Sequence, residues 1–182
     1  MKQARDAGFS PSMVQLLESQ GTVVKESRGI FALADTPLDD FAVIALRWPK
    51  TIFSHSSALY LHGLTDIVPS VFEVSLPQGY KEAQLLDEYP NLIVHHDSRV
   101  LYSLGSIDTL SPTGTPVKAH DKERTICELL LSRKKGQVDT QLLSQALSCY
   151  FEGAEKNLQK LMHYAHELKI APEMRMYLEV FS

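Results

Sequence analysis

The stretch SPSMVQLLESQGTVVKESRGIFAL, residues 10–33, contains a helical and a strand-like pattern side by side. Ser10 followed by Pro11 is typical of a helix start, because the hydroxyl can cap free backbone N–H groups and proline at the first helical position loses no hydrogen bond. Gly21 predicts the end of this helix, since glycine adopts the left-handed conformation without strain. Four apolar side chains are expected to share one face of the helix: Met13, Val14, Leu16 and Leu17.

The second half of the stretch predicts a β-hairpin. Two β-rich runs flank the polar and basic segment from Lys25 to Gly29, which favours a turn there. Ahead of the stretch, Lys2 to Ala7 is compatible with a short helix that Gly8 ends. Helix, glycine turn, helix and hairpin is the order of a winged helix-turn-helix.

The rest of the chain predicts a mixed α/β domain with a helical C-terminal end. A helix is expected to begin near Asp39 or Asp40 and to end before Pro49. Another is expected in FSHSSALYLHGL, residues 53–64, and four more between Asp121 and Phe181. Short runs rich in β-branched or aromatic residues predict strands at residues 72–76, 92–95 and 117–118. The expected division is a DNA-binding type of module in residues 1–35, a linker helix in residues 36–50 and an α/β domain in residues 51–182.

Composition excludes several classes of protein. The 182 residues are 44% hydrophobic and 22% charged, which indicates a folded chain with a core rather than a disordered one. No apolar run approaches the roughly 18 residues of a membrane span, and the polar start MKQARDAG does not resemble a secretion signal, so a cytoplasmic location is expected. The two cysteines, Cys127 and Cys149, are too few for a disulfide framework and are expected to be small core residues.

Charge argues against a protein that coats nucleic acid everywhere. The net charge is −4, and the first 33 residues carry four basic and three acidic side chains. Because phosphate attraction scales with the number of basic side chains that meet it, the electrostatic footprint of this module is expected to be small.

Histidines and serines are crowded in residues 53–64, but their spacing matches no known site. His55 and His62 are seven residues apart, not four as in the HExxH zinc helix, and neither serine after His55 lies in the GxSxG turn that exposes a nucleophile. A packing helix with Ser54 as its N-cap accounts for the polar residues of this segment.

The other histidines give no site either. His95 and His96 are consecutive in a predicted strand, so their side chains should point to opposite faces. His163 and His166 share a helix face but lack a third ligand at a recognisable spacing. No catalytic, cofactor or metal site is therefore predicted, and the chain is expected not to be an enzyme.

The segment DKERTICELLLSRKK, residues 121–135, predicts a helix with an acidic N-cap and a basic C-terminal end. Asp121 is the expected N-cap, and Arg124 can pair with Glu128 at the i, i+4 spacing. Basic side chains at the C-terminal end of a helix interact favourably with the negative end of the helix dipole. The same cations are a second candidate for contact with phosphate or an acidic partner: Arg133, Lys134 and Lys135.

Taken together, the segments resemble the AbiEi family, the antitoxin and transcriptional repressor component of type IV abortive-infection toxin–antitoxin systems. The similarity extends over most of the chain. It is carried by ARDAGFSPSMVQLLESQGTVVKESRGIFAL (4–33), TIFSHSSALYLHGLTDIVPSVFEVSLP (51–77), DKERTICELLLSRKK (121–135) and NLQKLMHYAHELKIAPEMRMYLEVF (157–181).

The resemblance implies a bacterial repressor that binds inverted repeats in double-stranded operator DNA upstream of its own operon. By analogy with other winged-helix repressors of inverted repeats, a pair of protomers is expected on the DNA. The resemblance also implies a C-terminal domain that opposes a nucleotidyltransferase toxin without a stable complex, and no cofactor. The recognition helix would be Ser10–Gln20 and the wing Thr22–Leu33. The residues that the resemblance brings to DNA are Ser10, Ser12, Met13, Gln15, Gln20, Lys25, Ser27 and Arg28.

One feature departs from the family pattern. The family's winged helix begins with a further helix, whereas only seven residues precede Gly8. The expected fold is α+β and begins with a truncated N-terminal winged helix-turn-helix. The apolar core of this module is expected to be uncovered on the side where the missing helix would pack. Two alternatives stay open: an interaction protein that works through its C-terminal domain and has vestigial DNA binding, and a nucleic-acid-modifying enzyme that uses Glu73, His95 or His96.

Overall fold

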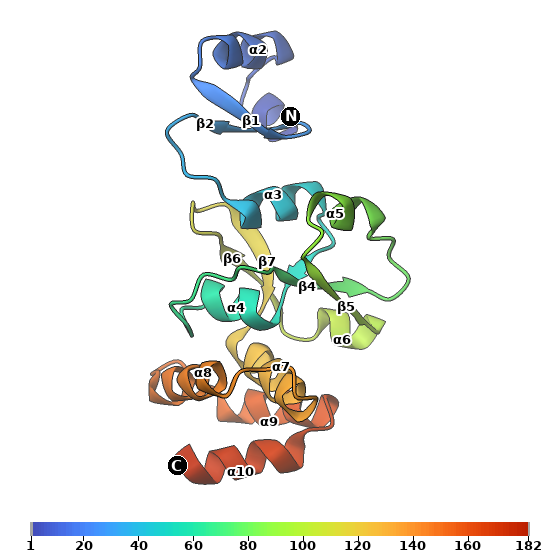
Figure 1. Ribbon diagram of the computed structural model, residues 1–182, viewed down its shortest axis with the longest axis vertical. Coiled ribbons are helices and arrows are strands. Elements are labelled where there is room, and N and C mark those ends of the chain that lie inside the picture. The colour runs from blue at the N-terminus through green and yellow to red at the C-terminus, as the bar shows by residue number, and fades with distance from the viewer. Residues whose placement is uncertain (1, 182) are drawn as a thin grey trace.

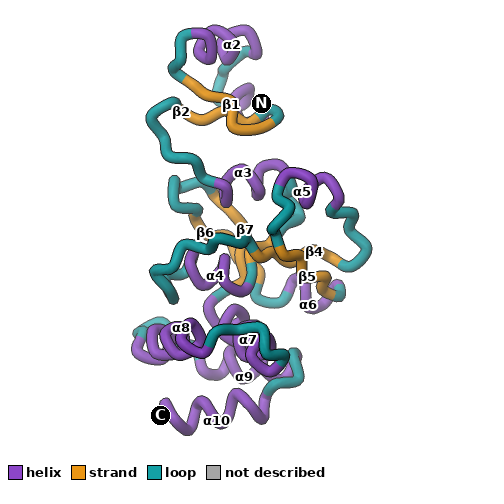
Figure 2. The backbone as a smooth tube through the Cα atoms, in the orientation of Figure 1, coloured by secondary structure: helices purple, strands orange, loops and turns teal. Residues whose placement is uncertain are grey.

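Residues 2–181 are described by a computed structural model, in which they form three tiers along the longest axis (Figure 1). Two helices and a hairpin form the first tier, a five-stranded sheet with its covering helices forms the second, and four helices form the third (Figure 2). The two ends of the chain lie at opposite ends of the molecule (Figure 1). The predicted α+β class is confirmed.

The first tier contains the elements in the predicted order: α1 (Lys2–Asp6), α2 (Pro11–Ser19), β1 (Val23–Ser27) and β2 (Ile30–Leu33). The two strands pair antiparallel. Helix α2 begins after Ser10, whose hydroxyl accepts a hydrogen bond from the backbone N–H of Met13 at 3.2 Å. Gly21 has a φ of +71°, a conformation that favours glycine and lets the chain turn toward the hairpin.

The predicted apolar face of α2 is only half correct. Val14 is 6% exposed, but Met13 and Leu16 are 48% and 55% exposed. Val14 and Leu17, three residues apart, line the hollow between α2 and the hairpin, whereas no described element buries the flank that carries Met13 and Leu16. Among the described side chains of residues 4–38, Val14 alone is buried, so the first tier has almost no core of its own.

The sheet has the strand order β5-β4-β3-β7-β6. Its strands are β3 (Ile52–Phe53), β4 (Glu73–Pro77), β5 (Ile93–Asp97), β6 (Ser106–Leu110) and β7 (Pro116–His120). β3 pairs antiparallel with β4 and parallel with β7, β4 pairs parallel with β5, and β6 pairs antiparallel with β7. Strands β4, β5 and β7 confirm the three predicted strands, with ends moved by one or two residues.

Two strands and two helices of the second tier were not predicted from the sequence. β3 has only two residues, too few to show an alternation, and β6 has the largely polar sequence SIDTL. The helices are single short turns or little more: α5 (Ala83–Glu88) and α6 (Arg99–Ser103). Elements of this length depend on tertiary contacts, which cannot be predicted from the periodicity of the local sequence.

The sheet has one apolar and one polar face, because side chains alternate along each strand. The apolar face packs against α3 (Asp40–Arg47) and α5, and its core residues include Phe53, Val74, Leu76, Val117 and Ala119. The opposite register positions carry Glu73, Ser75, His95, Asp97 and His120. Helix α4 (His55–Leu61) lies on this polar side with α6, across the sheet from α3 and α5 (Figure 1).

Helix α3 begins at the predicted place and packs against the sheet. The carboxylate of Asp39 caps it by accepting from the backbone N–H of Ala42 at 3.1 Å. Phe41, Ile44 and Trp48 are buried in the core of the sheet. The helix predicted as a linker therefore packs as part of the second tier.

The third tier confirms the four predicted C-terminal helices. They are α7 (Lys122–Lys134), α8 (Thr140–Glu152), α9 (Leu158–Glu167) and α10 (Ala171–Phe181). Helix α7 is central, since it contacts α4, α8, α9 and α10. None of the described helices combines the length and the apolar character needed to span a bilayer.

The two cysteines differ in their surroundings. Cys127 is buried in α7 as predicted, but the prediction for Cys149 is wrong, because this thiol is exposed on α8. Helix α8 turns Ala146, Leu147 and Tyr150 inward, which leaves Cys149 on the outer side. Burial raises the pKa of the Cys127 thiol well above its ordinary value, so its reactive thiolate form is suppressed.

This difference predicts the result of thiol titration. In the native protein one thiol should react quickly with a disulfide reagent such as DTNB, and two should react after unfolding in guanidinium. Cys149→Ser should abolish the fast reaction, whereas Cys127→Ser should leave it unchanged. Two fast thiols in the native protein would contradict the burial of Cys127.

Candidate functional site

The residues proposed to meet DNA lie in the first tier, on α2 and the hairpin. Six of them are exposed: Ser12, Met13, Gln15, Gln20, Lys25 and Arg28. Ser10 is exposed as well, but its hydroxyl is occupied in capping α2. Ser27 is half-buried, and its hydroxyl accepts a hydrogen bond from the guanidinium of Arg47 in α3. Ser10 and Ser27 therefore have structural roles, and the other six side chains are open to a partner.

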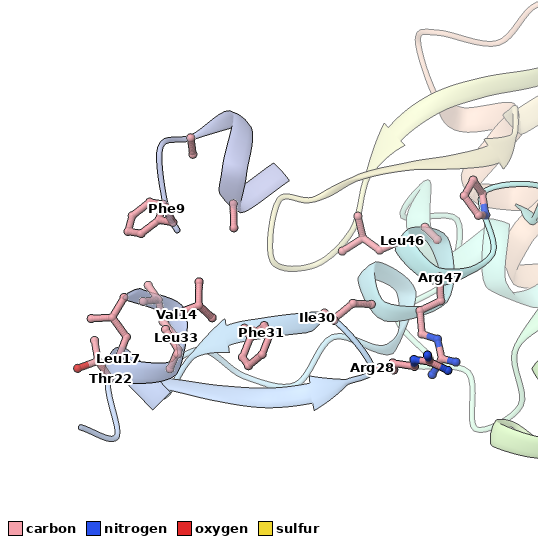
Figure 3. Close-up of a pocket in the computed structure, with 16 residues that line it drawn as sticks. Phe9, Val14, Leu17, Thr22, Arg28, Ile30, Phe31, Leu33, Leu46 and Arg47 are labelled. Carbon is pink, nitrogen blue, oxygen red and sulfur yellow. The ribbon is translucent and has the colours of Figure 1, made fainter. Parts of the chain in front are cut away.

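An apolar hollow of about 970 Å³ lies beside this surface, between α2, the hairpin and α3. Figure 3 shows side chains from these elements around the open space. Its apolar lining includes Phe9, Val14, Leu17, Phe31, Leu33 and Leu46, and Arg28 and Arg47 also line it. The hollow leaves the apolar side chains of this module largely uncovered.

The second basic candidate lies far from this surface. Arg133, Lys134 and Lys135 are exposed at the C-terminal end of α7, in the third tier. Lys134 forms an ion pair with Glu173 of α10. Lys134 therefore supports the packing of α7 against α10, and all three cations lie at the end of the helix where the dipole is negative.

A cluster of charged side chains lies between the polar face of the sheet and α7. Its centre is Glu128, which is 2% exposed. Nε of Arg124 lies 3.0 Å and Nδ1 of His120 lies 2.7 Å from Oε1 of Glu128. Oε2 of Glu128 accepts a hydrogen bond from the backbone N–H of His55 at 3.1 Å, and Asp97 approaches the Arg124 guanidinium to 3.6 Å. The predicted pair of Arg124 and Glu128 is thus confirmed, inside a larger network.

Electrostatics keep this carboxylate ionised. Burial alone would raise the pKa of Glu128, but the nearby His120, His55 and Arg124 hold it well below its ordinary value. For His55 the balance is different, because burial lowers its pKa despite the neighbouring carboxylate of Glu128. A neutral imidazole is therefore favoured at position 55.

Next to this network, His55 meets Glu73 of β4 and His95 of β5. Nε2 of His95 lies 2.8 Å from Oε2 of Glu73, and the rings of His55 and His95 stack with centroids 3.8 Å apart. Oε1 of Glu73 accepts a hydrogen bond from the hydroxyl of Ser56 at 2.8 Å. One potential ligand atom from each of His55, Glu73 and His95 lies within 4.8 Å of the other two.

The N-terminus of α4 corrects the prediction for Ser54. This residue occupies the N-cap position, but its side chain makes no capping hydrogen bond and instead lies 3.1 Å from Nδ1 of His55. The carboxylates of Glu128 and Glu73 reach the free N–H groups of His55 and Ser56, so acids from other elements cap the helix. His55 itself has a φ of +48°, a conformation that costs a non-glycine residue about 1–3 kcal/mol.

The prediction that His95 and His96 point to opposite faces of the strand is confirmed. His96 points away from His95 and contacts Glu82 rather than Glu73. His163 and His166 are exposed on α9. Glu73 and His95 were named only in the open enzyme alternative, and His55 was not joined to them, because strand pairing and the start of α4 bring the three residues together from distant parts of the chain. The available signal was weak: two polar residues at inward positions of predicted strands.

Removing an ion pair of the buried network should lower the free energy of unfolding more than removing an exposed ion pair. Glu128→Ala should lower the free energy of unfolding by about 3–5 kcal/mol, because it leaves the Arg124 charge buried without its partner. Glu128→Gln, which preserves shape but not charge, should also destabilise. Urea denaturation of each variant measures the change.

The matched control is an exposed pair. Asp108→Ala removes the partner of Lys118, at 2.9 Å on the surface of the sheet, and should cost no more than about 1 kcal/mol. A loss from Glu128→Ala as small as that from Asp108→Ala would show that the network does not hold the tiers together.

A comparison with protein-family models gives no match to this chain, and a comparison with curated proteins gives no significant match.

Proposed function

We propose that this chain is a DNA-binding transcriptional repressor of the AbiEi type, the antitoxin of a type IV abortive-infection operon. The observation that carries the proposal is the arrangement of the first tier. A capped helix, α2, follows a short helix and a turn, and an antiparallel hairpin with an exposed basic tip follows α2. In a winged helix-turn-helix the second helix enters the major groove, so α2 is the proposed recognition helix.

The exposed side of α2 suits the reading of bases. Ser12 and Gln15 offer hydroxyl and amide groups that both donate and accept hydrogen bonds, and Met13 adds an apolar surface. Base edges in the major groove present donors, acceptors and the thymine methyl group, which such side chains can match. The polar groups of Ser12 and Gln15 on the exposed side of α2 therefore support a role in sequence recognition.

Lys25 and Arg28 of the hairpin are the proposed phosphate contacts. Both are exposed, and neither is needed to pair with an acid in the way Lys134 pairs with Glu173. Two such contacts per protomer give modest affinity that falls with salt. An inverted repeat read by two protomers doubles the number of contacts, which is why the proposal includes a pair of protomers on DNA.

The second and third tiers are proposed to carry the antitoxin function against a nucleotidyltransferase toxin. They are joined by α7 and the Glu128 network into a continuous body with two well-buried cores. The proposal includes no stable toxin complex and no enzymatic activity of this chain, and it places the protein in the cytoplasm.

The test is a titration of the purified protein with labelled duplex from the DNA upstream of its own gene, beside a scrambled duplex, at two salt concentrations. Tighter binding to the native duplex that persists at the higher salt is expected. Lys25→Ala combined with Arg28→Ala should weaken binding to both duplexes and reduce the salt slope by about 1 for each lost phosphate contact.

Two further double variants serve as controls. Lys81→Ala with Arg99→Ala removes the same charge from exposed positions of the second tier and should leave binding almost unchanged. Arg133→Ala with Lys135→Ala tests the basic end of α7 and should also have little effect. Equal, weak binding to both duplexes that salt abolishes would contradict the repressor and place the function in residues 36–182.

A further inference from the structure

Three side chains from separate elements converge beside the N-terminus of α4. His55 is the first residue of that helix, Glu73 begins β4, and His95 lies in the middle of β5. The parallel pairing of β4 and β5 places His95 opposite Ser75, on the same face as Glu73. One potential ligand atom from each residue lies within 4.8 Å of the others.

We propose that His55, Glu73 and His95 form a binding site for a divalent transition metal of the zinc class. Two imidazoles and one carboxylate are the ligands that Zn²⁺ takes in sites with three protein ligands and an open fourth position. Imidazole donors select Zn²⁺ and its neighbours over Mg²⁺ or Ca²⁺, which require mainly oxygen ligands. An ion would replace the 2.8 Å contact between His95 Nε2 and Glu73 Oε2. The rings of His55 and His95 now stack with their planes at 17°, so the more exposed ring, that of His95, must turn for both imidazoles to direct a nitrogen at the ion.

Hydrogen bonds orient two of the three proposed ligands, Glu73 and His55. Oε1 of Glu73 accepts from the Ser56 hydroxyl at 2.8 Å, which leaves Oε2 to face the site. Nδ1 of His55 lies 3.1 Å from the Ser54 hydroxyl, which leaves Nε2 as the donor for a metal. Outer contacts of this kind orient the ligands in metal sites. His55 also keeps a φ of +48°, and the hydrogen bond from its N–H to Glu128 holds that backbone in place.

The site is accessible from solvent. The side chains of His95 and Glu73 are 31% and 19% exposed, so an ion can enter and a water molecule can occupy the open coordination position. The three ligands carry one negative charge when both imidazoles are neutral, which leaves a bound divalent ion with a net charge of about +1. A positively charged centre at an open position suits an anionic or polarisable ligand.

A neighbouring group of Asp97, His120 and Glu128 also brings three potential ligand atoms together. It is a poor metal site, because the Arg124 guanidinium already occupies it, with Nε 3.0 Å from Glu128 and Nη2 3.6 Å from Asp97. His120 and Glu128 are also almost completely buried. The cation of that group is therefore Arg124, and the metal site is the outer one.

The test is calorimetric titration of ZnCl₂ into the full chain after removal of metals with a chelator. One Zn²⁺ should bind per chain, and Co²⁺ in its place should give the visible absorption of a four-coordinate ion. MgCl₂ should give no binding. His95→Ala and Glu73→Gln should each lower zinc affinity by more than the roughly 10- to 100-fold typical of losing an outer contact, and Ser56→Ala should fall within that range.

The matched control is His163→Ala combined with His166→Ala, which removes two exposed imidazoles from α9 and should leave zinc affinity unchanged. Circular dichroism of each metal-free variant checks that it is folded, and Glu73→Gln keeps the shape of the site if His95→Ala does not fold. No stoichiometric binding, or binding that is lost only in the α9 variant, would overturn the site. Because these experiments contain no DNA, their failure leaves the repressor proposal standing, and the reverse also holds.

Discussion

The buried carboxylate of Glu128 is the constraint on which the junction of the second and third tiers depends. An ionised acid in the interior must be matched by opposite charge or by hydrogen-bond donors, because its solvation by water is lost. Arg124 comes from the same helix, His120 from the end of β7 and the N–H of His55 from the start of α4. The need to satisfy one carboxylate thus fixes a strand end and two helices relative to one another.

The same constraint explains the unusual backbone at the start of α4. The first N–H of that helix points to Glu128 and the second to Glu73, so two acids replace the expected serine cap. His55, which makes the first of these contacts, has a φ of +48°. Its ring then lies against His95. The capping contacts of α4 and the pairing of β4 with β5 thus bring His55, Glu73 and His95 together, and the strained backbone of His55 lies beside the candidate metal site.

The sequence correctly predicted the contacts that form between residues close together in the chain. Ser10 caps α2, Asp121 caps α7 and Arg124 pairs with Glu128, because each depends on residues three or four positions apart. Contacts across the sheet lie outside that range: nothing near Glu73 records that β5 will bring His95 beside it. Cys149 was also expected in the core, but the sequence carries no information on whether another element covers that side of α8.

In the first tier the local structure is complete, but the hydrophobic core is almost absent. Its caps, turn and hairpin are complete, yet Val14 is its single buried side chain among residues 4–38, and apolar groups such as Phe31 and Leu33 face an open hollow. Covering such a side chain contributes roughly 1.5–3 kcal/mol. A surface that packs into the hollow would therefore decide both the stability of this tier and the angle at which α2 meets the hairpin. In the proposed repressor the orientation of α2 matters, because a recognition helix reads bases only when it is held at a defined angle to the groove.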